Sequence, residues 1–92
     1  MMELGGNIKL QGFNDLDPAT LIVVKKIVGN YTKKLTQQHS DFLGLSLDLS
    51  KEDKNHKISI NLSRKSGNMM SEATEENLFF ALSSALEKIN KE

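Results

Sequence analysis

Two stretches of the chain alternate apolar and polar residues with a period of two, which is typical of strands that bury one face. In the stretch 42–50 every second residue is a leucine, namely Leu43, Leu45, Leu47 and Leu49. In the stretch 58–63, Ile58, Ile60 and Leu62 alternate with Ser59, Asn61 and Ser63. The charged segment 51–55 separates the two stretches, so they predict a hairpin.

Two shorter strands are predicted on either side of this hairpin. Ile8 and Leu10 alternate with Lys9 and Gln11 in the stretch 7–13. The turn residues 66–68 lead into a second short strand at 69–73. Residues 1–6 have no such pattern, and we expect them to be flexible.

Two segments have the three-and-four spacing of amphipathic helices. The first begins at Pro18, and the Asp17 carboxylate before it should accept backbone N–H groups. Its apolar stripe consists of Leu21, Val24, Ile27, Val28, Tyr31 and Leu35. The second should begin after Thr74 as N-cap, with Glu75 and Glu76 in its first turn. Its apolar stripe consists of Leu78, Phe79, Leu82, Ala85, Leu86 and Ile89.

The order of these elements is strand, helix, three strands, helix, and it predicts a single domain over residues 1–92. Because each strand has one apolar face, both helices should cover the same face of a four-stranded mixed sheet. The helical connection makes the first two strands parallel through a right-handed crossover. The predicted fold class is therefore an α/β two-layer sandwich of the α+β kind.

Candidate catalytic chemistry is sparse. The 92 residues include no cysteine, which excludes a disulfide, a zinc-cysteine site and a thiol nucleophile. The two histidines, His39 and His56, have neither metal-ligand nor triad spacing and are expected to be exposed in loops. We therefore expect no enzyme, metal, cofactor or small-molecule substrate. No segment resembles a secretion signal or a membrane span, so we expect a cytoplasmic protein without a membrane partner.

Charge is balanced over the whole chain but not along it. Twelve basic and twelve acidic residues give a net charge of zero, which argues against tight non-specific binding to a polyanion. The segment 18–38 has no acid and four lysines, namely Lys25, Lys26, Lys33 and Lys34. Exposed helices usually mix both signs, so this pattern indicates either an ordinary solvated face or a phosphate-binding face.

Two large apolar residues fall on the outer faces of the predicted helices. Ile22 lies among the lysines, and Phe80 lies opposite the apolar stripe of the second helix. Both are candidate partner contacts. The outward face of the sheet is predicted to be polar and lacks the aromatic residues on which single-stranded bases stack. It consists of Lys9, Gln11, Ser46, Asp48, Ser59, Asn61 and Ser63.

Over residues 7–91 the sequence resembles the ribosome hibernation factors, also called ribosome-associated inhibitors. The resemblance rests on the element order and on the stretches 7–12, 24–27, 33–35, 77–82 and 85–89. It implies a non-enzymatic protein whose basic side chains contact RNA of the small ribosomal subunit and block the channel used by messenger and transfer RNA. The residues that match are Lys25, Lys26, Lys33, Lys34 and Lys88. Phe13 departs from the pattern, because the family usually has a basic residue there.

Two hypotheses about function follow. In the first, the protein binds the small ribosomal subunit or another structured RNA through its lysine-bearing helix and modulates translation. In the second, it is a protein-interaction module or a homodimer that uses Ile22, Phe80 or the open sheet face.

Overall fold

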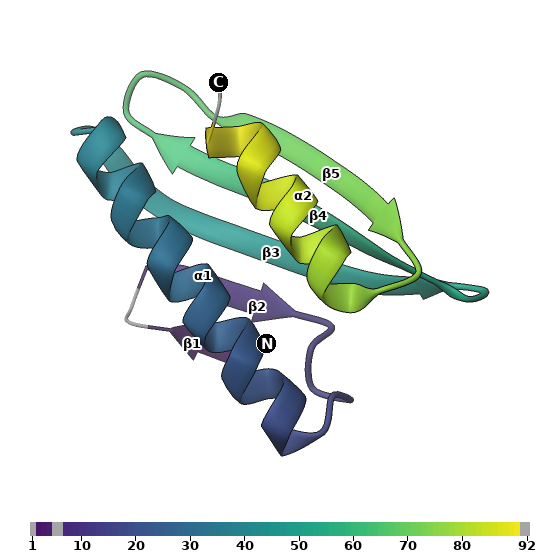
Figure 1. Ribbon diagram of the computed structural model, residues 1–92. Helices are drawn as coiled ribbons and strands as arrows, with labels where there is room; N and C mark the ends of the chain where they lie inside the picture. Colours follow the sequence, from purple (N-terminus) through teal and green to yellow (C-terminus); the bar gives the residue numbers. More distant parts are fainter. Residues whose placement is uncertain (1, 5–6, 91–92) are drawn as a thin grey trace.

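The computed structural model describes residues 2–4 and 7–90, and it consists of one sheet with two helices covering one of its faces (Figure 1). The elements in chain order are β1 (Met2–Leu4), β2 (Ile8–Gln11), α1 (Pro18–Gln38), β3 (Phe42–Glu52), β4 (Asn55–Arg64), β5 (Met69–Glu75) and α2 (Leu78–Asn90). None of the helices in these ranges is long and apolar enough to cross a membrane.

The sheet topology confirms the predicted fold class. β2 and β3 are parallel and are connected through α1, while β3, β4 and β5 form successive antiparallel pairs. Both helices lie on the same side of this four-stranded mixed sheet (Figure 1). A short fifth strand, β1, pairs antiparallel with β2 at the edge. Residues 1–6 were expected to be flexible; Met2–Leu4 forms this strand, and residues 1, 5 and 6 lie outside the described residues, as do Lys91 and Glu92.

The core lies between the sheet and the helices. Alternate residues of the strands point into it, including Leu10, Leu45, Leu47, Ile58, Ile60 and Leu62, and all are at most 2% exposed. α1 contributes Val24, Val28 and Leu35, and α2 contributes Ala81, Leu82, Ala85, Leu86 and Ile89. The apolar stripes predicted from the sequence are therefore the packed faces of both helices.

Gly12 allows the chain after β2 to turn back toward the core. Its φ is +83°, and a Cβ at this position would collide with the carbonyl oxygen of Leu49. Glycine tolerates both constraints because it has no side chain. The next residue, Phe13, is fully buried. The position where the resemblance implies a basic residue thus holds a core aromatic in this protein.

The prediction that Leu43 belongs to the core is wrong. The pairing of β3 with β4 shifts register between Phe42 and Gly44, which indicates a β-bulge. The extra residue breaks the alternation, so Leu43 is 50% exposed, and Phe42 packs against the core instead.

The helix cap predicted at Thr74 is wrong, whereas Asp17 is the N-cap residue of α1, as predicted, but without the expected capping bond. Thr74 and Glu75 belong to β5, where they pair with Lys57 and His56 of β4. α2 starts later, and Asn77 caps it: its Oδ1 accepts hydrogen bonds from the backbone N–H groups of residues 79 and 80, at 2.9 and 3.1 Å. At the start of α1, the Asp17 carboxylate accepts a hydrogen bond from the hydroxyl of Thr20, and its side chain makes no capping bond to a backbone N–H.

Because of the bulge, the same leucine-to-alanine substitution should affect the free energy of unfolding differently at two positions of β3. Leu47→Ala should lower the free energy of unfolding by about 2 to 5 kcal/mol, because it leaves a cavity in the core. Leu43→Ala should change it by less than about 0.5 kcal/mol, because that side chain lies at the surface. Urea denaturation followed by circular dichroism measures both, and equal losses would show that the alternation continues through residue 43.

Candidate nucleic-acid interface

The lysines of α1 lie on its solvent side. Lys25, Lys26, Lys33 and Lys34 are all exposed, whereas Val24, Val28 and Leu35 face the core. We call these four lysines the lysine face. α1 contains no acidic residue. Across residues 2–4 and 7–90 the ion pair present joins Lys57 to Glu72 at 3.6 Å, so no lysine of the lysine face is in an ion pair.

One acid does approach this helix, and it comes from α2. The carboxylate of Glu87 lies near the hydroxyl of Tyr31. Burial raises the pKa of Tyr31, and the nearby negative charge of Glu87 raises it further. The ammonium of Lys34 lies 5.1 Å from the centroid of the Tyr31 ring, within range of a cation–π contact. Lys34 is therefore the most restrained lysine of the face.

Two apolar side chains share the solvent side of α1 with the lysines. Ile22 is 57% exposed, which confirms its predicted outward position, and Val23 is 43% exposed. Val23 was not singled out in the sequence, although its place between Ile22 and Val24 on the helical wheel would have indicated it. The N-terminal half of α1 thus presents two apolar side chains beside Lys25 and Lys26, whereas the C-terminal half presents Lys33 and Lys34.

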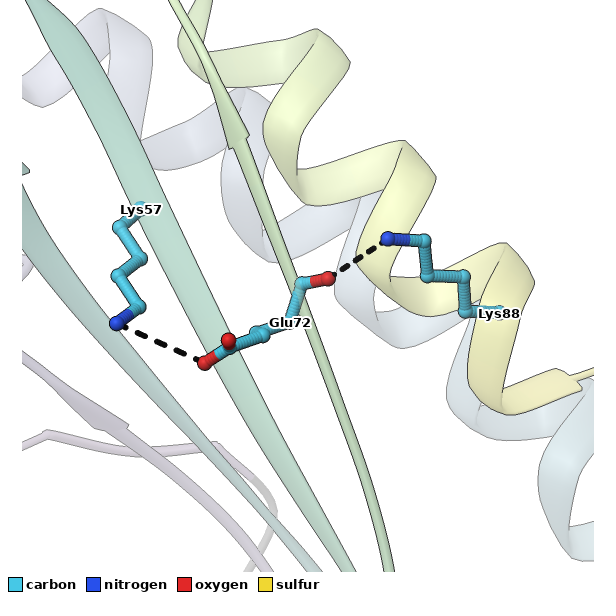
Figure 2. A network of polar contacts seen from close by, with 3 residues as sticks. All are labelled: Lys57, Glu72 and Lys88. Atoms are coloured by element: carbon cyan, nitrogen blue, oxygen red, sulfur yellow. Dashed lines mark hydrogen bonds and ion pairs between the residues drawn. The ribbon is translucent and has the colours of Figure 1, made fainter.

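Lys88 lies apart from the lysine face. Its ammonium donates a hydrogen bond to the backbone carbonyl of Glu72 in β5 at 2.9 Å (Figure 2). The carboxylate of Glu72 in turn pairs with Lys57 of β4 (Figure 2). Because β5 is the last strand of the sheet, Lys88 covers a carbonyl at its edge. The structure therefore does not bring Lys88 together with the lysines of α1.

Two further basic residues lie near the C-terminal end of α1. Arg64, the last residue of β4, pairs with Phe42, and its Nη1 lies 3.3 Å from Nδ1 of His39 just after α1. The backbone N–H of the exposed Lys65 donates to the carbonyl of Asp41 at 3.0 Å. This extension of positive charge was not predicted from the sequence, although the predicted hairpin places the end of β4 beside the start of β3.

Both histidines are partly buried, which corrects the expectation that they are exposed in loops. His39 accepts from Arg64, and its Nε2 is buried without a hydrogen-bond partner among the described residues. His56 is the second residue of β4, and its Nδ1 donates a hydrogen bond to the backbone carbonyl of Glu76 at 2.7 Å. Within the described ranges no group of three histidine or acidic side chains lies close enough to hold a metal ion.

The outer face of the sheet is polar at the predicted positions, and Met70 adds an apolar side chain to it. A row of side chains crosses it in register from Lys9 through Ser46 and Asn61 to Met70. Met70 is 76% exposed. Met70 is exposed because it lies on the edge strand, opposite the polar Asn61. The row contains no aromatic ring on which a base can stack.

The contact between Tyr31 and Glu87 predicts a titration that can be measured directly, because Tyr31 is the single tyrosine and the chain has no tryptophan. The absorbance of tyrosinate should rise at a pH above the ordinary pKa of 10.0. Glu87→Gln should lower the pKa, because it removes the negative charge that opposes ionisation. A raised folded-state pKa also means that the associated stability is complete below pH 10.0 and is lost as the pH rises through the folded-state pKa. An unchanged titration in Glu87→Gln would contradict this contact between the helices.

No protein-family model and no curated protein sequence matches the chain. Among solved structures it is similar to the N-terminal domain of Thermus thermophilus Protein Y, with a TM-score of 0.67 and 15% sequence identity over 91% of this chain and 89% of that one. It is also similar to a ribosomal subunit interface protein from Coxiella burnetii, with a TM-score of 0.65 and 11% identity over 92% of this chain and 90% of that one. The chain therefore has the fold of both proteins along nearly its whole length.

Proposed function

We propose that this protein binds structured RNA of the ribosome through the lysine face of α1 and acts there without catalysis. The observation that carries the proposal is the lysine face itself: four exposed lysines on a helix without acids, none of them in an ion pair among the described residues. Most of the binding energy of such surfaces comes from neutralising phosphates. The fold shared with a ribosomal subunit interface protein supports the ribosome as the source of that RNA.

The geometry of α1 suits an irregular phosphate backbone. Lys26 and Lys33 are seven residues apart and lie on one side of the helix, about 10 Å from each other along its axis. Lys25 and Lys34 flank them on either side. Lysine ammonium groups are compact charges on flexible stems, so they can reach phosphates whose positions are set by the fold of the RNA.

The finer part of the proposal concerns the place of binding and its consequence. We place the protein on the small ribosomal subunit, in the cytoplasm, where occupying an RNA surface would modulate translation. The resemblance to ribosome hibernation factors supports this assignment. Lys88 contributes only if RNA displaces its hydrogen bond to Glu72, whereas Arg64 and Lys65 extend the basic surface at the C-terminal end of α1.

A protein-interaction module or homodimer is the second candidate, favoured by the exposure of Ile22 at 57% and Phe80 at 67%. The two candidates differ in their response to salt. Three or four phosphate contacts would weaken binding roughly 20-fold to 150-fold between about 50 and 200 mM salt. Apolar contacts respond little to salt over this range. Co-sedimentation with ribosomal subunits at several salt concentrations therefore separates the two candidates, and a flat response would contradict the RNA proposal.

A charge-reversed variant tests the surface itself. Lys26→Glu combined with Lys33→Glu should abolish co-sedimentation, while thermal stability stays nearly the same because both side chains are exposed. Lys9→Glu combined with Lys54→Glu is the matched control, since it changes the net charge equally on the outer sheet face and in the hairpin turn. Equal losses of binding in the two double variants would show that overall charge, and not α1, governs the interaction.

A further inference from the structure

Phe80 is exposed at the start of α2, beside an open hollow. It is 67% exposed, whereas the next residue, Ala81, is fully buried. The hollow has a volume of about 990 Å³ and lies between the turn of the β3–β4 hairpin and the start of α2. Asp53 and Lys54 line it from the hairpin, and Glu75 and Glu76 line it from the end of β5. Two segments that are distant in sequence, residues 53–55 and 74–80, thus form one groove beside an aromatic ring.

The walls of this groove are held in place by hydrogen bonds. Asn77 caps the first turn of α2 through the backbone N–H group of Phe80 at 3.1 Å, which fixes the start of the helix. His56 donates to the carbonyl of Glu76 at 2.7 Å and so ties the segment after β5 to the hairpin. The hairpin itself turns in two residues, with Asp53 at a φ of 54°. A partner would therefore meet a preformed surface and would not have to order it.

The charge of the groove is opposite to that of the lysine face. Asp53, Glu75 and Glu76 present three carboxylates against the single ammonium of Lys54. None of these four residues takes part in an ion pair within the described ranges. Each carboxylate therefore remains available to a partner, and a polyanion such as RNA would be repelled.

We infer that this groove is a docking site for an arginine-bearing segment of a protein partner. A guanidinium group can stack on the exposed face of Phe80 and at the same time form two parallel hydrogen bonds to a carboxylate of Glu75 or Glu76. A lysine ammonium can do only part of this, because it is a point charge without a planar face. An exposed ring in the same groove as three carboxylates that form no ion pair within the described ranges thus complements arginine better than lysine.

A second copy of this chain fits the groove poorly. The sequence contains a single arginine, Arg64. Its side chain is partly buried and is already engaged, with Nε donating to the carbonyl of Gly67 at 3.1 Å and Nη1 facing His39. The complementary segment must therefore come from a different protein.

The groove also lies far from the C-terminal end of α1, near which Lys33 and Lys34 of the lysine face lie. β3 starts just after α1 and runs for 11 residues to the hairpin turn, which at 3.3 Å per residue is roughly 35 Å. Figure 1 shows the hairpin turn at the end of the sheet away from the C-terminal end of α1. Both surfaces can be occupied at once, so the inference holds whether or not α1 binds RNA.

The test uses the whole protein and a fluorescein-labelled peptide of alternating glycine and arginine, with a glycine and lysine peptide of equal length as the reference. Fluorescence anisotropy should show tighter binding of the arginine peptide. Phe80→Leu keeps an apolar side chain but removes the ring, and Phe80→Ser removes both. Each should weaken arginine binding roughly twofold to fivefold while the melting temperature stays nearly the same. Glu75→Gln with Glu76→Gln should weaken binding and flatten its salt dependence.

Met70→Ser is the control, because it removes a still more exposed apolar side chain from another face. It should leave peptide binding unchanged, and none of these variants should alter co-sedimentation with ribosomal subunits. Equal affinity for the two peptides, or unaltered arginine binding in both Phe80 variants, would overturn the inference. Conversion of a dimer to a monomer by Phe80→Ser would overturn it as well, by identifying the occupant as a second copy.

Discussion

The arrangement of this protein depends on burying one face of a single sheet. β2, β3 and β4 each place alternate aliphatic residues on that face, and two helices suffice to cover it. Each helix then has only one side committed to the core. The outer side of α1 makes no contribution to packing, so its charge can be of one sign without weakening the core. The lysine face can exist because the fold does not use that side of the helix.

One-sided burial is also why much of the fold could be predicted from the sequence. Periods of two and of three to four residues identify which side of each element is apolar, and the helices had to meet the sheet on its apolar side. The sequence-based predictions fail at positions where pairing between strands determines the local structure. The bulge beside Leu43 depends on the register between β3 and β4. Thr74 has a local preference for capping a helix, but its pairing with β4 makes it part of β5 instead. Neither effect has a signal within its own segment.

The same distinction applies to the candidate sites: features of a single helix could be predicted from the sequence, and contacts between two elements could not. A helical wheel is enough to predict that Ile22, Phe80 and the lysines of α1 face solvent, because exposure follows from the position of the apolar stripe. It cannot show that Lys88 bonds to the edge of β5, that Glu87 approaches Tyr31, or that Arg64 lies beside the end of α1. Each of these contacts joins residues from two elements, so each requires the assembled fold. The acidic groove beside Phe80 was missed for this reason, since its walls come from two segments that are distant in sequence.

The net charge of zero therefore does not indicate the local charge that a partner meets when it binds. At physiological ionic strength, charges are screened over about 8 Å. The acidic groove lies at the hairpin end of the sheet, away from the C-terminal end of α1 (Figure 1). A partner at either surface meets the local charge and hardly senses the opposite one. The balanced composition weakens long-range attraction to a polyanion, yet it leaves short-range phosphate contacts intact. On this reasoning, the chain can be neutral overall and still present one surface suited to RNA and another suited to a basic protein segment.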